Sequence, residues 1–229
     1  MKLVIISDTH NKHNQITLPE GDVLIHCGDA TSLGRRHECE KFMDWFSKQP
    51  FEHKIFIAGN HDWGFDHDEE SRSEFMNDRN FFFREPTGLY LELEKYAKSK
   101  GLIYLNETSV EIGGLKFFGT PRSKYFHGWA FNGDPYAGHD WSNIPDDTDV
   151  LITHGPPYGI LDVTYYDKKS VGDILLKERI AELKKLKACL FGHIHEQPGI
   201  LVLDGVTYVN ASTCNLRYEP LNPAQVLDL

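Results

Sequence analysis

Residues 2–10 read KLVIISDTH, from Lys2 to His10, and this stretch contains the pattern that decides the fold. An apolar run, too continuous for a half-exposed strand, ends abruptly in an aspartate and a histidine. Such runs are typical of central strands that are buried on both faces of a sheet. Because ligands bind beyond the carboxyl ends of strands in α/β sheets, the polar pair is predicted to face a binding crevice.

The same pattern recurs four more times along the chain. Strands are predicted over Lys2–Ser7, Asp22–Cys27, Lys54–Ala58, Asp149–Thr153 and Ala188–Phe191. The polar residues that follow these runs are Asp8 and His10, Asp29, Asn60 and His61, His154, and His193 and His195. A single histidine or aspartate at a strand end is more often a hydrogen-bonded cap than a ligand. Five strand ends with the same chemistry instead predict one shared site.

Two hairpins and two helices complete the expected elements. The hairpins are predicted at Ser109–Ile112 with Leu115–Phe118, around Gly113-Gly114, and at Ile200–Leu203 with Val206–Val209, around Asp204-Gly205. Amphipathic helices are predicted at about 36–48, with Phe42, Trp45 and Phe46 on one face, and at about 170–186, with Val171, Ile174, Leu175, Leu183 and Leu186 on one face. No linker or repeat divides the sequence, so one α/β domain is expected over residues 1–229.

The composition excludes several classes of protein. With 40% hydrophobic and 25% charged residues, the chain is neither disordered nor a collagen-like or coiled-coil rod. Its 24 Lys and Arg against 34 Asp and Glu leave a net charge of −10, which argues against nucleic acid as a partner. No apolar run reaches the roughly 18 residues of a membrane span, and the N-terminus becomes polar too early for a signal peptide. A cytoplasmic protein without a membrane partner is expected, and the sequence indicates no oligomeric state.

The types of candidate ligand predict a pair of metal ions. Seven side chains are candidates, namely Asp8, His10, Asp29, Asn60, His154, His193 and His195. Carboxylates, imidazoles and a carboxamide without a thiolate suit Mn, Fe or Zn, and Mn is the expected ion. With Asp29 shared, the set divides into two groups of four, enough for two ions roughly 3.5–4 Å apart. Such a site has a net charge of about +1 and favours a small anionic phosphate ester or nucleotide.

Five short motifs resemble a known family. They are Asp8-Thr9-His10, Gly28-Asp29, Gly59-Asn60-His61-Asp62, Thr153-His154-Gly155 and Gly192-His193-Ile194-His195. In this order they resemble the calcineurin-like metallophosphoesterase superfamily, which implies an α/β fold of two stacked mixed β-sheets flanked by helices. Segments such as Asn210–Cys214 are also similar to the brain metallophosphoesterase-domain subgroup, which is grouped with class III cyclic-nucleotide phosphodiesterases.

The resemblance implies the ligand sets of the two ions. One ion is expected on Asp8, His10, Asp29 and His195, and the other on Asp29, Asn60, His154 and His193. Subgroup members have glycine in place of one histidine of the last block, whereas this chain has His193, so an intact dinuclear centre is expected. The phosphate-binding arginine motif of protein phosphatases is absent after Gly28-Asp29, which argues against a phosphoprotein substrate.

The expected activity is phosphodiester hydrolysis, with cyclic nucleotides as the leading substrates. A hydroxide that bridges the two ions is the expected nucleophile, and the Asn60 amide is expected to stabilise the phosphoryl oxygens. His61 adjoins a ligand without belonging to either metal set, so it is predicted to protonate the leaving oxygen. Asp62 either orients His61 or stabilises a turn.

Substrate specificity is predicted to come from the aromatic-rich segment Thr120–Thr148, which has no sustained periodicity. Arg122, Trp129 and Phe131 are its candidate substrate-binding residues; the alternative is a loop that packs on its own aromatic side chains. Two other functions stay open. One is a nuclease acting on DNA or RNA ends, and the other is a metal-binding scaffold without catalysis.

Overall fold

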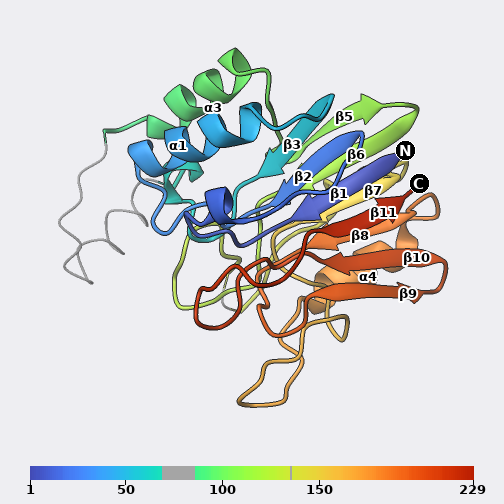
Figure 1. The fold of residues 1–229 in the computed structure, drawn as a ribbon. Helices are drawn as coiled ribbons and strands as arrows, with labels where there is room; N and C mark the ends of the chain where they lie inside the picture. Colours follow the sequence, from blue (N-terminus) through green and yellow to red (C-terminus); the bar gives the residue numbers. More distant parts are fainter. Residues whose placement is uncertain (69–85, 135) are drawn as a thin grey trace.

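Two β-sheets are stacked face to face, with helices on their outer faces (Figure 1). The structure is a computed structural model that describes residues 1–68, 86–134 and 136–229. The first sheet has the strand order β11-β1-β2-β3-β4, and the second has the order β5-β6-β7-β8-β10-β9. Neighbouring strands are parallel except at β11, β5 and β9, so both sheets are mixed. The predicted α/β fold of two stacked mixed sheets is confirmed.

The strands of the two sheets have the following bounds. They are β1 (Lys2–Ile6), β2 (Val23–Cys27), β3 (His53–Ile57), β4 (Ile103–Tyr104), β5 (Thr108–Ile112), β6 (Leu115–Thr120), β7 (Val150–Thr153), β8 (Ala188–Phe191), β9 (Gly199–Leu203), β10 (Val206–Asn210) and β11 (Gln225–Asp228). The helices are α1 (Arg36–Ser47), α3 (Leu89–Ser99) and α4 (Ile174–Glu182), with short 3-10 turns at His13–Gln15 and Trp63–Phe65. All five predicted central strands and both predicted hairpins are present within a residue or two.

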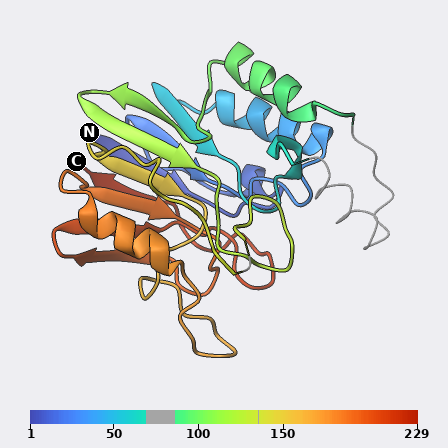
Figure 2. The ribbon, with the colours of Figure 1, turned by 180° about the vertical axis from the view of Figure 1, so that it is seen from behind.

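The central strands are mostly apolar because both of their faces are covered. In β1, Leu3 and Ile5 lie in the core between the two sheets, whereas Val4 and Ile6 pack on the opposite face, in the core that contains Phe42 of α1. All four side chains have no exposed surface. Figure 2 shows α4 on the outer face of the second sheet. A parallel strand between two covered faces has no solvent side, so the alternation typical of an exposed sheet is lost.

Both hairpins turn through two residues with left-handed backbone. Gly113 and Gly114 have φ values of 57° and 79°, and Asp204 and Gly205 have values of 50° and 82°. Two consecutive positive φ angles match the right-handed twist of the flanking strands, and glycine or aspartate adopts them at the lowest cost. The two turn sequences therefore set the register of β5 with β6 and of β9 with β10.

The predicted helix at 170–186 is shorter than expected, and part of its predicted apolar face was wrong. The Asp173 side chain accepts a hydrogen bond from the Leu176 backbone N–H at 3.0 Å, so the helix begins at Ile174. This start leaves Ile174 and Leu175 exposed and turns Leu176 and Ile180 into the core. Helix α3 and strands β4 and β11 were not predicted from the sequence.

Because Leu176 of α4 is buried and Ile174 is exposed, replacing each with alanine is expected to change the free energy of unfolding by different amounts. Leu176→Ala removes a side chain that is 1% exposed and is expected to lower the free energy of unfolding by about 2–5 kcal/mol. Ile174→Ala, at a residue that is 52% exposed, is the matched control and should stay within about 0.5 kcal/mol. Urea unfolding of both variants measures the difference. A larger loss for Ile174→Ala would contradict the observed phase.

No helix within the described ranges is both long enough and apolar enough to cross a lipid bilayer. The four cysteines, Cys27, Cys39, Cys189 and Cys214, are free thiols and are buried.

Candidate metal centre

The carboxyl ends of the parallel strands meet at one edge of the sandwich, opposite the chain termini (Figure 1). Each predicted polar residue follows one of these strands, so the topology brings together side chains from residue 8 to residue 195. The strands that contribute are β1, β2 and β3 from the first sheet and β7 and β8 from the second. The site therefore spans both sheets, which is why its residues are far apart in sequence.

Three overlapping groups of side chains could hold metal ions. Within each group the candidate ligand atoms lie no more than 4.8 Å apart, and the groups are Asp8, His10 and His195; His10, Asp29 and His61; and Asp29, His154 and His193. Asn60 joins the last group, because its Oδ1 lies 2.9 Å from His154 Nε2. All seven predicted metal ligands and His61 thus lie together.

Asp29 occupies the position between the two halves of the site. Its Oδ2 lies 3.8 Å from His10 Nε2, and its Oδ1 lies 3.4 Å from His154 Nε2. The carboxylate is only 2% exposed, and the His61 backbone N–H donates to Oδ1 at 2.8 Å. One carboxylate that turns one oxygen to each half has the geometry of a bridging ligand.

Backbone carbonyls fix the orientation of three of the histidine rings. His10 Nδ1 faces the Thr31 carbonyl at 3.2 Å, and His154 Nδ1 faces the Cys27 carbonyl at 2.9 Å. His195 Nδ1 faces a third carbonyl, of Asn215, at 3.1 Å. A carbonyl can only accept, so each Nδ1 carries a hydrogen, and in the neutral ring the Nε2 lone pair turns into the site. This second layer of contacts is typical of histidines that bind metals.

The inward-facing atoms fit a cation. His10 Nε2 and His195 Nε2 lie 3.4 Å apart, and in their neutral rings both are acceptors. His154 Nε2 and Asn60 Oδ1 form a second pair of this kind at 2.9 Å. Two facing acceptors need a proton or a metal ion between them. A set of nitrogen and oxygen donors suits first-row divalent ions.

The electrostatics of the site also favour bound cations. Burial alone would lower the pKa of His154 and His195, but Asp29 beside the first and Asp8 beside the second raise both pKa values to about 9. Burial would raise the pKa of Asp8, but the neighbouring His195 and His154 hold it below its usual value. Both carboxylates therefore remain charged, and their field attracts positive charge to the centre.

The ligand loops are held in a strained backbone conformation. Asp8, His10, Asp29 and His193 have φ values of 52°, 40°, 56° and 67°. Non-glycine residues in the left-handed region cost about 1–3 kcal/mol each and cluster at functional sites. Glycine is required close by for a different reason, since a Cβ on Gly192 would overlap the Asp8 carboxylate.

His61 lies at the rim of the metal centre. Its Nδ1 faces the Ser32 carbonyl at 2.8 Å, which leaves Nε2 turned toward Asp29 Oδ2 at 4.0 Å. The Trp129 ring stacks on the imidazole with a centroid separation of 4.0 Å. Asp62 does not orient His61: its carboxylate accepts the backbone N–H groups of Ala30, Thr31 and Gly59. Of its two suggested roles, the structure favours the turn.

A cavity of about 430 Å³ opens over the metal centre. Besides site residues, its walls include Lys124, Tyr125, Phe126, Thr164, Val171, Glu196, Leu216 and Tyr218. The aromatic-rich segment therefore contributes to the cavity, but through Tyr125 and Phe126. The three predicted substrate-binding residues lie elsewhere. Arg122 is paired with Glu107, Trp129 stacks on His61, and Phe131 packs near Trp63 and Ala130.

Three residues that support the site were not predicted from the sequence. Ser212 donates a hydrogen bond from Oγ to Asp8 Oδ2 at 2.9 Å, Asn215 holds His195, and the Tyr218 ring lies edge-on to His10 at 4.8 Å. The sequence signal was limited to the Asn210–Cys214 segment, which was noted only for its family resemblance. A carbonyl that orients a ring carries no signal in the sequence, because every residue has one.

Comparisons with known proteins agree with this geometry. The family model described as calcineurin-like phosphoesterase matches residues 1–197. The human metallophosphoesterase domain-containing protein 1 is 40% identical over 237 residues, which cover 100% of this chain and 71% of that protein. A UPF0046 protein of Caenorhabditis elegans is 37% identical over 217 residues, 94% of this chain and 70% of that protein.

A solved structure supports the fold. The phosphopantetheinyl hydrolase of Mycobacterium tuberculosis aligns with a TM-score of 0.59 and 18% identity, over 95% of this chain and 90% of that chain. The family match, the relatives that align along nearly all of this chain and the clustered candidate ligands lead to one conclusion. This chain belongs to the calcineurin-like phosphoesterase family, and that membership implies a metal-dependent phosphoester hydrolase.

Proposed function

We propose that the protein is a phosphodiesterase that uses two metal ions, with Mn²⁺ as the preferred ion and small phosphodiesters such as cyclic nucleotides as substrates. The observation that carries the proposal is the convergence of seven candidate ligands on a shared Asp29, with His61 at the rim. Bound ions would supply a water of lowered pKa and charge to offset the phosphoryl oxygens.

Two residues around the ions, Asn60 and His61, are proposed to act on the substrate. The Asn60 amide, whose Oδ1 lies 2.9 Å from His154 Nε2, is proposed to stabilise a phosphoryl oxygen. His61 is proposed as the general acid, because Nδ1 is held by Ser32 and Nε2 is the nitrogen that faces the site. A proton on Nε2 would pass to the leaving oxygen as the P–O bond breaks.

The charges of the cavity wall support a diester over a monoester. Besides the histidines of the site, the cavity lining includes Lys124, and Glu196 offsets its charge. Arg122 lies in an ion pair with Glu107 and does not add to the lining. A diester carries one negative charge where a monoester carries up to two, so it needs less compensation. The apolar walls at Tyr125, Phe126 and Leu216 suit an organic leaving group.

The test is hydrolysis of bis(p-nitrophenyl) phosphate by metal-stripped protein before and after addition of Mn²⁺, with p-nitrophenyl phosphate as the monoester. Metal-dependent turnover that favours the diester is expected, followed by turnover of cyclic nucleotides. Preference for the monoester would overturn the diesterase assignment. Bound metal without turnover of either ester would indicate a binding scaffold, and cleavage of single-stranded DNA or RNA ends would indicate a nuclease.

Trp129→Ala is expected to lower kcat by about 10- to 100-fold with little change in KM, because the indole positions His61 and does not line the cavity. Steady-state kinetics with bis(p-nitrophenyl) phosphate and with a cyclic nucleotide measure both constants. Phe131→Ala, at a neighbouring aromatic residue in the same loop, is the matched control. A raised KM for the nucleotide alone would instead indicate that Trp129 stacks on a base.

A further inference from the structure

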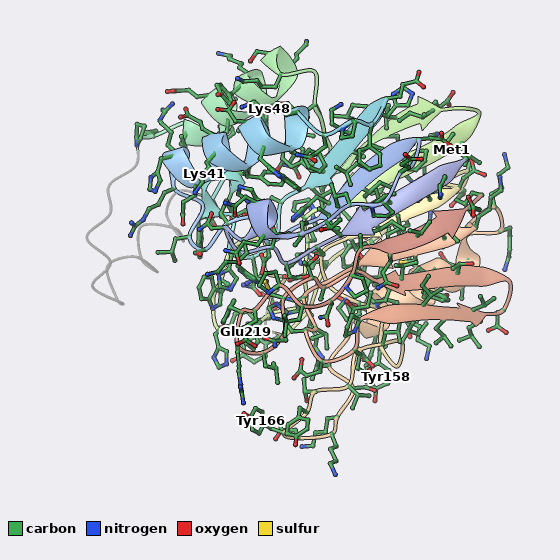
Figure 3. All side chains as sticks on the ribbon, in the orientation of Figure 1. Met1, Lys41, Lys48, Tyr158, Tyr166 and Glu219 are labelled. Atoms are coloured by element: carbon green, nitrogen blue, oxygen red, sulfur yellow. The ribbon has the colours of Figure 1, made fainter. Side chains whose placement is uncertain are left out.

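The segment that follows β10 crosses from the second sheet to the end of the first. Ser212 forms an isolated parallel bridge with Ser7, and the Thr213 backbone N–H donates to the Ser7 carbonyl at 2.9 Å. The Cys214 N–H then donates to the Asp8 carbonyl at 3.3 Å. Figure 3 shows Glu219, at the end of this segment, among the loops at the carboxyl ends of the strands. The segment 212–218 therefore lies against the metal centre, although the family match ends at residue 197.

Ser212 determines which oxygen of Asp8 faces the site. Its Oγ donates to Asp8 Oδ2 at 2.9 Å, whereas the His193 backbone N–H is shared between Oδ2 at 2.9 Å and Oδ1 at 3.1 Å. The other oxygen, Oδ1, lies 3.4 Å from His195 Nε2. Ser212 and Asp8 are almost fully buried, so water does not compete for this hydrogen bond.

Asn215 holds His195 through a carbonyl that its own side chain keeps in place. Its Oδ1 accepts the backbone N–H groups of Arg217 and Glu219 at 2.8 Å and 3.1 Å. These bonds close a turn, within which the Asn215 carbonyl accepts from the Tyr218 N–H at 2.8 Å and from His195 Nδ1 at 3.1 Å. Loss of the side chain should release the turn and with it the ring of His195.

Tyr218 covers the same half of the site. Its backbone is left-handed, with φ at 57°, and its ring lies edge-on to His10 at 4.8 Å and to His195 at 5.6 Å. The ring also lines the cavity. A strained backbone at a cavity-lining aromatic residue is consistent with a functional constraint on its position.

The contacts of Ser212, Asn215 and Tyr218 are made to one half of the metal centre. Ser212, Asn215 and Tyr218 touch Asp8, His10 and His195. On the other half, His154 is held by the Cys27 carbonyl, and the His193 ring packs edge-on against Phe126 at 5.7 Å. Within the described residues, Ser212 is linked to the second half through Asp8, whose carboxylate also accepts the His193 backbone N–H.

We infer that Ser212, Asn215 and Tyr218 form a positioning segment for the metal half-site made by Asp8, His10 and His195. The inference rests on the proposed two-ion function, and it assigns this segment a role in metal affinity at one half of the centre. Residues that orient metal ligands in this way are typically worth 10- to 100-fold in affinity.

The experiment is titration of the metal-stripped full chain with Co²⁺. Calorimetry measures the affinity of each binding step, and the visible absorption reports on the environment of the bound ion. Ser212→Ala and Asn215→Ala are expected to weaken one of two binding steps by about 10- to 100-fold and to change the absorption of that step. Asn215→Asp retains the oxygen that caps the turn but loses the Nδ2 bond to Glu219, so its affinity is expected to lie between that of Asn215→Ala and that of the wild type. Arg217→Ala, an exposed change in the same turn, is the matched control.

Double variants identify the affected half. In a His193→Ala protein, adding Ser212→Ala should still weaken the remaining Co²⁺-binding step. In a His10→Ala protein, adding Ser212→Ala should leave the affinity of the remaining Co²⁺-binding step unchanged. An equal response in both backgrounds, or none in either, would overturn the inference while leaving two-ion binding intact. A wild-type chain that binds no Co²⁺ would overturn the proposed function itself. Thermal unfolding of each metal-free variant shows that the fold is retained.

Discussion

Replacing Asp29 with asparagine is expected to remove both metal ions and to lower the rate of diester hydrolysis by on the order of 10³-fold or more. A loss of this size lies at the upper end of the losses seen when one electrostatic group of an active site is removed. The carboxylate turns one oxygen toward His10 and the other toward His154, so both half-sites lose charge from a single change. Asparagine has nearly the same shape, which keeps the buried position filled.

The measurement is the Mn²⁺ content after equilibrium dialysis, together with turnover of bis(p-nitrophenyl) phosphate. Asp147→Asn removes a carboxylate that pairs with Lys116 on the surface and serves as the control. Its metal content and turnover should equal those of the wild type. An Asp29→Asn protein that retains two ions would contradict the bridging position.

Replacing His61 with alanine is expected to leave both ions bound and to lower kcat by about 10²- to 10⁴-fold. Its Nε2 lies 4.0 Å from Asp29 Oδ2 at the rim of the centre, and Ser32 fixes the ring. The loss should be greatest for substrates with poor leaving groups, because these need a proton on the leaving oxygen. A series of aryl phosphodiesters with leaving groups of increasing pKa measures this dependence.

The control for His61 is His53→Ala, which removes a partly exposed imidazole that pairs with Glu52 at the start of β3. Unchanged turnover is expected. Normal rates of His61→Ala on a poor leaving group would exclude the general-acid role. Loss of one ion in His61→Ala would instead make His61 a ligand, as its approach to His10 and Asp29 permits.

The strands of the core could be predicted because burial on both faces requires a nearly continuous run of apolar residues. β8 is apolar at every position, β7 at all but its last residue and β1 at all but its first. Helix α4 could not be placed to the residue by periodicity alone, because the apolar side chains of Ile174, Leu175 and Leu176 are compatible with more than one phase. The Asp173 cap decides between them.

The metal centre could be predicted because parallel strands share one carboxyl edge, so residues that follow them must meet. The cavity could not, since its walls come from loops without periodicity. Tyr125 and Phe126 line it, whereas Trp129 and Phe131 of the same segment do not. Nothing in the composition of that segment distinguishes an aromatic side chain that faces the cavity from one that packs against His61.

The sequence by itself determined the buried strands and the eight polar residues at their ends, because burial on both faces leaves a local pattern of apolar side chains. Its motifs also indicated the family, and that resemblance implied the two mixed sheets. Only the tertiary structure decided how those residues are held. The Ser212 hydroxyl on Asp8 and the Asn215 carbonyl on His195 join residues that are 204 and 20 positions apart. Such contacts depend on distances in the folded chain, since a hydrogen bond is made only when donor and acceptor come within about 3 Å of each other.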